Sequence, residues 1–254
     1  METRRKYKKL QTLFFQRGEV LIPETVNGRV LEEPEKKVHL FGFRDDALPI
    51  QYNFLIDEAE TMMQDGGGIH GPDAVISLVD YALTETMIGL NEEIRYLMQV
   101  AGHARCIIDA GFGRIKALYR RTDCETLSDL ENVVASSSTT NEAVLYKKPD
   151  GTSRFKWREW KTFLGEQFRA LKGIRSYQQF RFTSESPGII FLKKGEDNEE
   201  TSYCVFRGGN VLRSRPQEVQ AAGLSRERQA YLATHVRKYL RAKNKDTTCP
   251  LSEE

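Results

Sequence analysis

Cysteine is scarce in this sequence, and its spacing argues against two common uses of the residue. The chain has 254 residues and four cysteines: Cys106, Cys124, Cys204 and Cys249. None forms a C-x-x-C pair, and none has a histidine at zinc-finger spacing, so neither a structural zinc site nor a disulfide framework is indicated. We therefore expect reduced thiols in an intracellular protein, either nuclear or cytoplasmic.

Long apolar runs and an excess of one charge are also absent. No stretch approaches the ~18 apolar residues of a membrane span, and the charged N-terminus lacks the apolar core of a signal peptide, so no membrane partner is expected. Lys and Arg number 38 against 36 Asp and Glu. A nucleic-acid-binding surface would therefore need local segregation of basic residues. Phosphate-loop, nucleophile-elbow and dinucleotide-binding motifs do not occur.

The hydrophobic pattern predicts a mixed α/β protein. Alternating runs predict two hairpins, formed by residues 38–43 with 49–56 and by 177–183 with 189–193, and a further strand at 202–206. Apolar residues at helical spacing predict helices after Pro72, over 155–171 and from Ser225 onward. Thr122 and Glu125 fit a capping box for another helix, which would end near Val134.

The segment 135–141, ASSSTTN, has the composition of a linker. It suggests three regions: a basic N-terminal segment over 1–37, a core over 38–135 and an α+β region over 142–250. The aromatic residues of the predicted helix 155–171, among them Trp157 and Trp160, lie along one face. Interleaved basic residues could support base stacking there, but aromatics at helical spacing more often form a core, which we expect here.

The stretch 100–121, VAGHARCIIDAGFGRIKALYRR, gathers the side chains of most chemical interest. A strand at 94–100 and loop glycines at 111 and 113 are expected to precede a basic helix. His103 and Asp109 are candidates to bind one ion or phosphate. The simpler interpretation, favoured by the residues alone, is that Asp109 caps the helix and His103 closes a turn, while the basic residues face solvent.

Five short patterns follow one another in a particular order. They are VHLFGF, YNFLIDEA, VAGH followed by Asp109 and FGRIKALYRR, GIRSYQQFRFTSESPGIIF, and LSRERQAYL with TCP. As a set, from about Val38 to Pro250, they resemble a large eukaryotic family of domains of unknown function found in transposon-derived proteins. The core of that family is similar to ribonuclease-H-like transposases and integrases. The resemblance implies a degenerate ribonuclease-H-like mixed sheet flanked by helices, with an α+β C-terminal extension.

Two of the three acidic positions implied by the resemblance have no counterpart. In such a fold, three carboxylates hold two divalent cations that cleave a phosphodiester bond. Phe14 and Phe15 stand where the family has its first acid. The motif that carries the second acid is absent between Leu83 and Ile94, a shortening of roughly thirty residues, or one strand and one helix. This shortening is either genuine or an error in the gene model.

Only the third position has matching residues, Asp109 as a metal ligand and His103 beside it as catalytic remnants. One carboxylate and one imidazole do not hold two metal ions. The resemblance therefore implies a catalytically inactive transposase-derived protein without a cofactor. It also implies weak, sequence-independent nucleic-acid binding through Arg114, Lys116, Arg120 and Arg121. Loss of an internal strand would leave residues 38–93 marginally stable unless neighbouring strands close up.

Two alternatives remain open. The first is an active metal-dependent nuclease or transposase, in which Asp45, Asp46 or Asp57 joins Asp109 in holding Mg²⁺ or Mn²⁺. The second is a non-enzymatic module in which the aromatic and C-terminal helices bind a protein partner. Carboxylates converging on one cleft would favour the first alternative, and an exposed patch of Trp157 and Trp160 the second.

Overall fold

The protein has a mixed α/β fold, as expected from the sequence. The computed structural model describes residues 13–22, 25–26, 29–30, 36–45, 49–61, 83–98, 107–210 and 214–251. The strands within these ranges form several open sheets, and none closes into a barrel. The chain divides into two compact units, unit 1 with Met1–Met62, Arg105–Phe155 and Ala221–Glu254, and unit 2 with Met63–Ala104 and Lys156–Gln220. The three sequence-based regions stay a prediction, because contacts within a single conformation do not test which segments fold independently.

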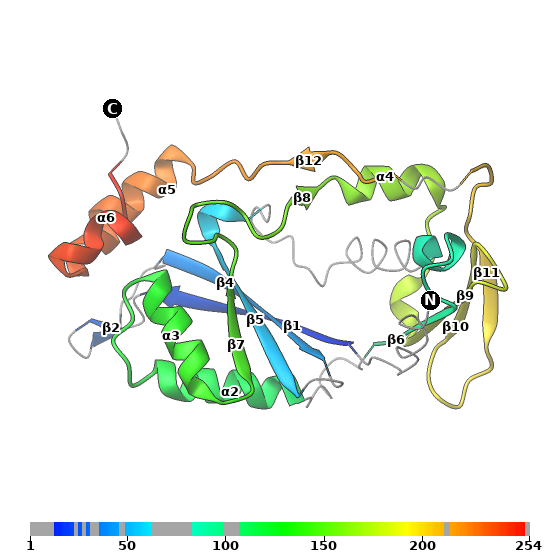
Figure 1. Ribbon diagram of the computed structural model, residues 1–254, viewed down its shortest axis with the longest axis horizontal. Coiled ribbons are helices and arrows are strands. Elements are labelled where there is room, and N and C mark those ends of the chain that lie inside the picture. Colours follow the sequence, from blue (N-terminus) through cyan, green and yellow to red (C-terminus); the bar gives the residue numbers. More distant parts are fainter. Residues whose placement is uncertain are drawn as a thin grey trace, which may run out of the picture. The chain divides into compact units, whose positions relative to one another are not determined.

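Unit 1 is built on a mixed four-stranded sheet in the order β1-β4-β5-β7 (Figure 1). The strands are β1 (Leu13–Ile22), β4 (Lys36–Asp45), β5 (Ile50–Asp57) and β7 (Asn141–Leu145). The first three pair antiparallel, which confirms the predicted first hairpin, and β7 pairs parallel to β5. Both β4 and β5 therefore have backbone partners on each side. The neighbouring strands therefore close up around β4 and β5, which is the condition under which a shortened sheet would not be left with an unpaired strand. The marginal stability of residues 38–93 stays a prediction.

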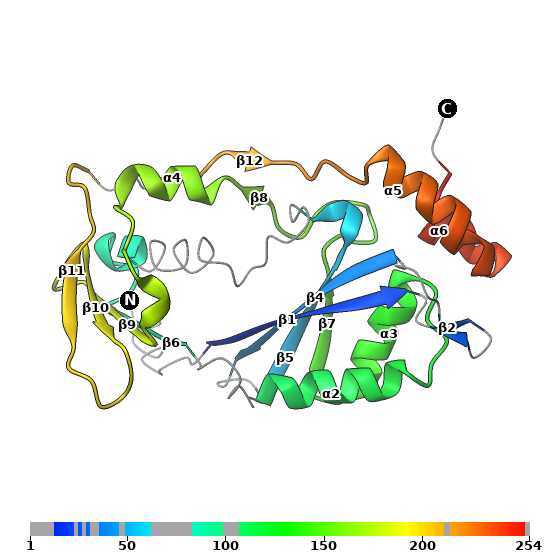
Figure 2. The same ribbon diagram turned by 180° about the vertical axis from the view of Figure 1, so that it is seen from behind.

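Two helices cover one face of this sheet, α2 (Ile107–Tyr119) and α3 (Leu127–Ser137) (Figure 2). Their buried side chains pack against alternate residues of the strands, such as Leu40 and Leu55. The capping box of α3 is formed by Thr126 and Asp129, four residues after the predicted one. The predicted pair fails because the Thr122 hydroxyl donates to the carbonyl of Leu118, at the end of the preceding helix.

The predicted linker at 135–141 is instead a short, ordered connection between α3 and β7. Its first residues belong to α3, and Asn141 begins β7. The Ser137 hydroxyl donates to the Val134 carbonyl at 2.7 Å, and the Ser138 hydroxyl lies 2.9 Å from that of Thr140. Hydroxyl groups that bind nearby backbone end a helix as readily as they populate a loop, so the composition of this segment was misleading.

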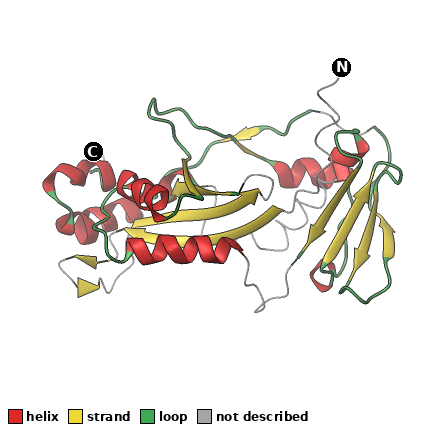
Figure 3. Ribbon diagram, turned by 60° about the horizontal axis from the view of Figure 1, so that its bottom comes forward, coloured by secondary structure: helices red, strands yellow, loops and turns green. Residues whose placement is uncertain are grey.

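Unit 2 contains an antiparallel four-stranded sheet in the order β11-β10-β9-β6 (Figure 3). The strands are β6 (Glu93–Leu97), β9 (Gln179–Thr183), β10 (Ile189–Lys193) and β11 (Thr201–Cys204). The predicted second hairpin and the strand after it are thus confirmed. Strand β6, expected to lead into α2, pairs instead with β9, where Ile94 lies opposite Phe182.

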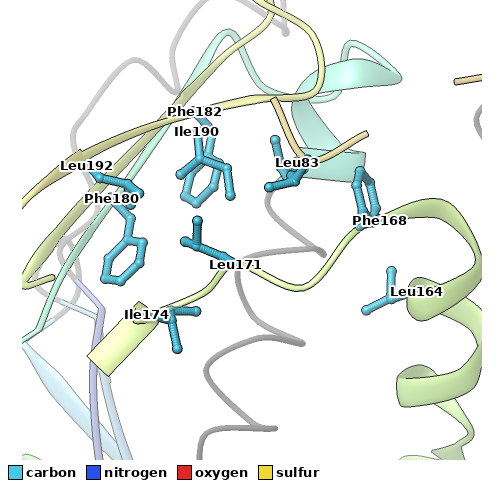
Figure 4. Packing of buried hydrophobic residues seen from close by; sticks show 10 residues of the cluster. Leu83, Leu164, Phe168, Leu171, Ile174, Phe180, Phe182, Ile190 and Leu192 are labelled. Atoms are coloured by element: carbon cyan, nitrogen blue, oxygen red, sulfur yellow. The ribbon is translucent and has the colours of Figure 1, made fainter. Parts of the chain in front are cut away.

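The predicted helix 155–171 is replaced by a short strand and a shorter helix. Strand β8 (Trp157–Arg158) pairs with β12 (Glu218–Val219), and helix α4 covers Trp160–Gln167. The short element η2 (Ile174–Ser176) follows beyond the predicted range. The core of unit 2 includes Leu164, Phe168 and Leu171, together with residues of the sheet and Leu83 (Figure 4). Trp160 and Phe163 pack against this core. The expectation that these aromatics serve as core is confirmed for both residues, which weakens the idea of an exposed aromatic patch.

The C-terminal segment belongs to unit 1 and has a small core of its own. It contains α5 (Arg226–Tyr231), η3 (Leu232–Val236), η4 (Arg237–Tyr239), η5 (Ala242–Asn244) and α6 (Lys245–Thr248). The Ser225 side chain caps α5, as predicted. Leu232, Val236, Leu240 and Cys249 are buried together. The remaining short elements of unit 1 are β2 (Thr25–Val26), β3 (Arg29–Val30) and η1 (Glu58–Glu60).

Candidate nucleic-acid interface on α2

Helix α2 lies close to the sheet because glycines occupy two of the contact points. A Cβ atom at Gly42 of β4 would come within 2.7 Å of Phe112 Cζ, and one at Gly111 would overlap the side-chain amide of Gln51. Gly111 and Gly113 lie inside α2 and not in a loop before it, so that expectation is wrong. Apolar residues around Gly111 bury enough surface to hold the helix in spite of the low helix propensity of glycine. The helix is thereby fixed on the sheet, with its opposite face toward solvent.

The four basic residues singled out in the sequence are all exposed. Arg114 and Lys116 lie in α2, and Arg120 and Arg121 follow it directly. The Arg120 amide donates to the Lys116 carbonyl, and the Arg121 amide to the Leu118 carbonyl, both at 3.1 Å, so the backbone continues the helical path. At this spacing Lys116 lies beside Arg120, and Arg114 lies two turns before Arg121. We call these four residues the basic surface.

Local contacts of the basic surface leave much of its charge available. Arg114 Nη1 donates to the Ser138 hydroxyl at 3.1 Å, which ties the guanidinium to the loop between α3 and β7 without neutralising it. Between residues 107 and 121 the only acidic residue is Asp109. The nearby carboxylate of Glu125 accepts hydrogen bonds from the Arg241 amide at 3.1 Å and from Asn244 Nδ2 at 2.7 Å. It also pairs with the Arg241 guanidinium.

Asp109 lies in the first turn of α2, half-buried, as the predicted position at the positive end of a helix requires. A carboxylate there is stabilised by the unpaired backbone amides and the helix dipole. His103 lies outside the described residues. Its proposed proximity to Asp109 therefore stays a prediction.

The alternative partners proposed for Asp109 are not brought to it by the described structure. Asp57 accepts a hydrogen bond from the Ala59 amide at 2.9 Å, and its other oxygen lies 2.8 Å from Lys36 Nζ. Asp57 is six residues from Gln51 along β5, about 20 Å, whereas Asp109 is half a helical turn from Gly111, which contacts Gln51. Asp57 and Asp109 are thus too far apart to share an ion. Asp46 and the side chain of Asp45 lie outside the described residues.

Among the residues that the structure describes, no three His, Cys, Asp or Glu side chains gather as a metal site would require. No helix in the described ranges combines the length and the apolar character needed to cross a membrane.

One buried polar group beneath α2 was not predicted from the sequence. Gln51, Asn53 and Asn141 are buried on the sheet face that α2 covers, with at most 6% of each residue exposed. Their sequence signal was a polar residue at an inward position of an alternating strand, as at Gln51 and Asn53 in QYNFL. Without the pairing of β5 with β7, that signal could not be distinguished from a solvent-facing position.

Comparison with known proteins places part of this chain beside an uncharacterised family. Residues 75–198 match the family model described as Domain of unknown function (DUF7869). The matched range includes α2, α3 and the β9–β10 hairpin, and it supports the resemblance to a domain of unknown function. No curated protein matches the chain. No solved structure matches it either.

Proposed function

We propose that this chain is a transposase-derived protein with a degenerate ribonuclease-H-like core, which binds nucleic acid weakly and without sequence preference and does not cleave it. The observation that carries the binding proposal is the basic surface. Four exposed basic side chains fall within residues 114–121, which contain no acid, although the chain as a whole has a formal charge of only +2. Phosphate groups are the ligand class that such a surface attracts.

A purely structural role explains part of the basic surface but not all of it. Cations near the C-terminal end of a helix stabilise the helix dipole, which accounts for Lys116, Arg120 and Arg121. Arg114 lies in the middle of α2, where that effect has decayed. Its guanidinium reaches the hydroxyl of Ser138, so it extends the positive surface beyond the helix end.

The proposal that catalytic activity has been lost rests on the positions and contacts of the acidic residues that would hold the metal ions. Phe14 and Phe15 belong to β1, at the position where the resemblance requires the first acid, and Asp57 is engaged by Lys36 and the Ala59 amide. Of the acids proposed as ligands, Asp109 is then the one that remains among the residues that the structure describes. Divalent-metal-dependent cleavage that disappears in Asp109→Ala would contradict this half of the proposal.

The binding half is tested by a salt titration on two duplexes of unrelated sequence. Each phosphate contact contributes about 0.9 to the slope of log affinity against log salt, so three contacts predict a slope of roughly 3. The double variant Arg120→Ala/Arg121→Ala should reduce this slope by about 1.8, equally on both duplexes.

A matched control uses the exposed lysines of unit 2, in Lys172→Ala/Lys194→Ala. This variant removes the same charge from the chain but leaves α2 unchanged, so its slope should equal that of the wild type. An unchanged slope in the α2 variant, or a strong preference for one duplex, would contradict the proposal.

A further inference from the structure

Three buried amide side chains lie between the sheet of unit 1 and α2. Gln51 and Asn53 come from β5, and Asn141 begins β7. Gln51 and Asn141 are partners in the parallel pairing of these strands, so they lie side by side on the same face. Buried amide groups normally have hydrogen-bond partners. Any oxygen or nitrogen of these side chains that lacks a partner therefore requires an explanation.

Each of the three amide nitrogens donates to a nearby acceptor, and these hydrogen bonds determine how each amide is oriented. Gln51 Nε2 donates to Asn53 Oδ1 at 2.9 Å, and Asn53 Nδ2 donates to the Gln51 carbonyl at 3.0 Å. Asn141 Nδ2 donates to the Ser137 hydroxyl at 2.8 Å and to the Gly111 carbonyl at 3.3 Å. Rotating any of these amides by 180° would turn an oxygen toward another acceptor.

Two acceptors are left over, Gln51 Oε1 and Asn141 Oδ1. Both atoms are buried without a hydrogen-bond partner. Both side chains meet α2 at the same residue. A Cβ at Gly111 would overlap Gln51 Oε1, and the Gly111 carbonyl accepts from Asn141. The two oxygens therefore border one region under the glycine of α2.

We propose that this region is a binding site for one internal water molecule, which donates its two hydrogens to Gln51 Oε1 and Asn141 Oδ1. The site requires a ligand that donates two hydrogens, because both unpaired atoms are acceptors. A divalent cation does not fit, since both oxygens belong to neutral amides and no group of three or more His, Cys, Asp or Glu side chains that could hold a metal ion occurs among the described residues. Water of this kind bridges buried polar groups that the protein leaves unpaired.

The water would join three elements at one point, β5 through Gln51, β7 through Asn141 and α2 through the position of Gly111. The proposed water gives a second reason for glycine at position 111, in addition to the close packing of α2 on the sheet. Any side chain there would occupy the space in which the water and the Gln51 amide meet. Helices α2 and α3 precede β7 in the chain, and the water lies where β7 pairs with β5 beneath α2.

The experiment measures magnetisation transfer from water to the Gly111 Hα protons in isotopically labelled full-length protein, in both the laboratory and the rotating frame. A water held for longer than nanoseconds gives transfer of opposite sign in the two frames. We expect this pattern in the wild type and its loss in Gln51→Met, which removes Oε1 at nearly constant side-chain length.

The Ser137 hydroxyl is the nearby group that could imitate a bound water by exchanging its proton with solvent. Ser137→Ala removes that hydroxyl and should leave the transfer to Gly111 unchanged. Absence of transfer in the wild type would overturn the proposal and leave Gln51 Oε1 with a weak Cα–H contact alone. Loss of transfer in Ser137→Ala would also overturn it. Both outcomes are measured on the wild type and on Ser137→Ala, so they can be obtained even if Gln51→Met does not fold. Neither outcome depends on nucleic-acid binding.

Discussion

The two glycines of α2 are two residues apart and have opposite surroundings. A Cβ at Gly111 would overlap Gln51, whereas one at Gly113 would have nothing within 4 Å. We predict that Gly111→Ala destabilises the fold by about 1–3 kcal/mol through overpacking. Gly113→Ala should instead stabilise it by up to about 1 kcal/mol, because alanine is the better helix former. Urea denaturation of both variants measures the difference, and equal changes in the free energy of unfolding would show that α2 does not approach the sheet at Gly111.

The thiols differ in reactivity according to their burial. Burial raises the pKa of Cys124 from its ordinary value of 9.0 to about 12, with smaller contributions from the carboxylates of Asp129 and Glu125. Burial also raises the pKa of Cys249, whereas Cys204 is exposed. Because the thiolate is the reactive form, only about 10⁻⁴ of Cys124 would be reactive at pH 8 even if it were accessible.

Thiol labelling at pH 8 in a Cys106→Ser background should therefore modify Cys204 alone. The Cys106 substitution is included because that residue lies outside the described part of the chain. Raising the pH to 10 should leave Cys124 unmodified, since its pKa remains above the pH of the measurement. Labelling of Cys124 at a rate comparable with that of Cys204 in the folded protein would show that α3 does not cover it.

At the scale of elements, local sequence pattern predicted the hairpins and failed on the connections. Alternation in VHLFGF and PIQYNFLI was sufficient for β4 and β5, because turn and strands are adjacent in the sequence. The partner of β5 on its other side lies about ninety residues away, and no local pattern encodes a pairing over that distance. The serine and threonine run before β7 was taken for a linker for the same reason, since its hydrogen bonds depend on the end of α3.

For the candidate site, too, the sequence predicted the features that depend on local pattern and not those that depend on distant residues. Exposure of the basic residues could be predicted, because apolar residues at helical spacing define the buried face of α2 and leave Arg114 and Lys116 outside it, one on each side. The role of Gly111 could not, since a glycine in a helix and a glycine in a loop look alike until the side chain it contacts is known. Gln51 and Asn141 were not identified from the sequence, because they form one buried polar group only when β5 pairs with β7.

Strands β4 and β5 should be among the slowly exchanging parts of the protein. Their amides have neighbouring strands on both sides, and their inward side chains, Leu40 and Leu55, are buried. We predict that their amide hydrogens exchange no faster than those of β9 and β10 in unit 2. Hydrogen exchange followed by mass spectrometry or NMR measures this directly. Much faster exchange in β4 and β5 would support the expectation that the shortened sheet is marginally stable.

At the scale of the whole chain, polar contacts join the C-terminal segment to the sheet of unit 1. Lys36 Nζ lies 2.8 Å from Asp57 Oδ2 and donates to the Thr248 carbonyl at 2.8 Å. Arg228 makes two hydrogen bonds to Glu58, each 3.1 Å long. The Thr248 hydroxyl donates to the Glu125 carbonyl at 2.7 Å, just before α3. The contacts made by Thr248 and Arg228 link residues that are more than one hundred positions apart.

Removal of Lys36 should therefore be costly for the whole of unit 1. Its side chain is only 11% exposed and that of Asp57 only 16%. Lys36→Ala leaves the Asp57 carboxylate without its cation, which we expect to cost about 3 kcal/mol in the free energy of unfolding. The control is Lys147→Ala, which breaks an ion pair with Glu60 whose lysine side chain is 50% exposed, and should cost less than about 1 kcal/mol. Equal costs would show that the C-terminal segment does not bury Lys36.

A duplex titration followed through backbone amide signals at low salt shows whether α2 presents its basic surface to nucleic acid. The largest shifts should occur at Arg114, Lys116, Arg120 and Arg121, decline as salt is added and become small in Arg120→Ala/Arg121→Ala. Shifts confined to unit 2, or shifts of the same size in the double variant, would contradict it.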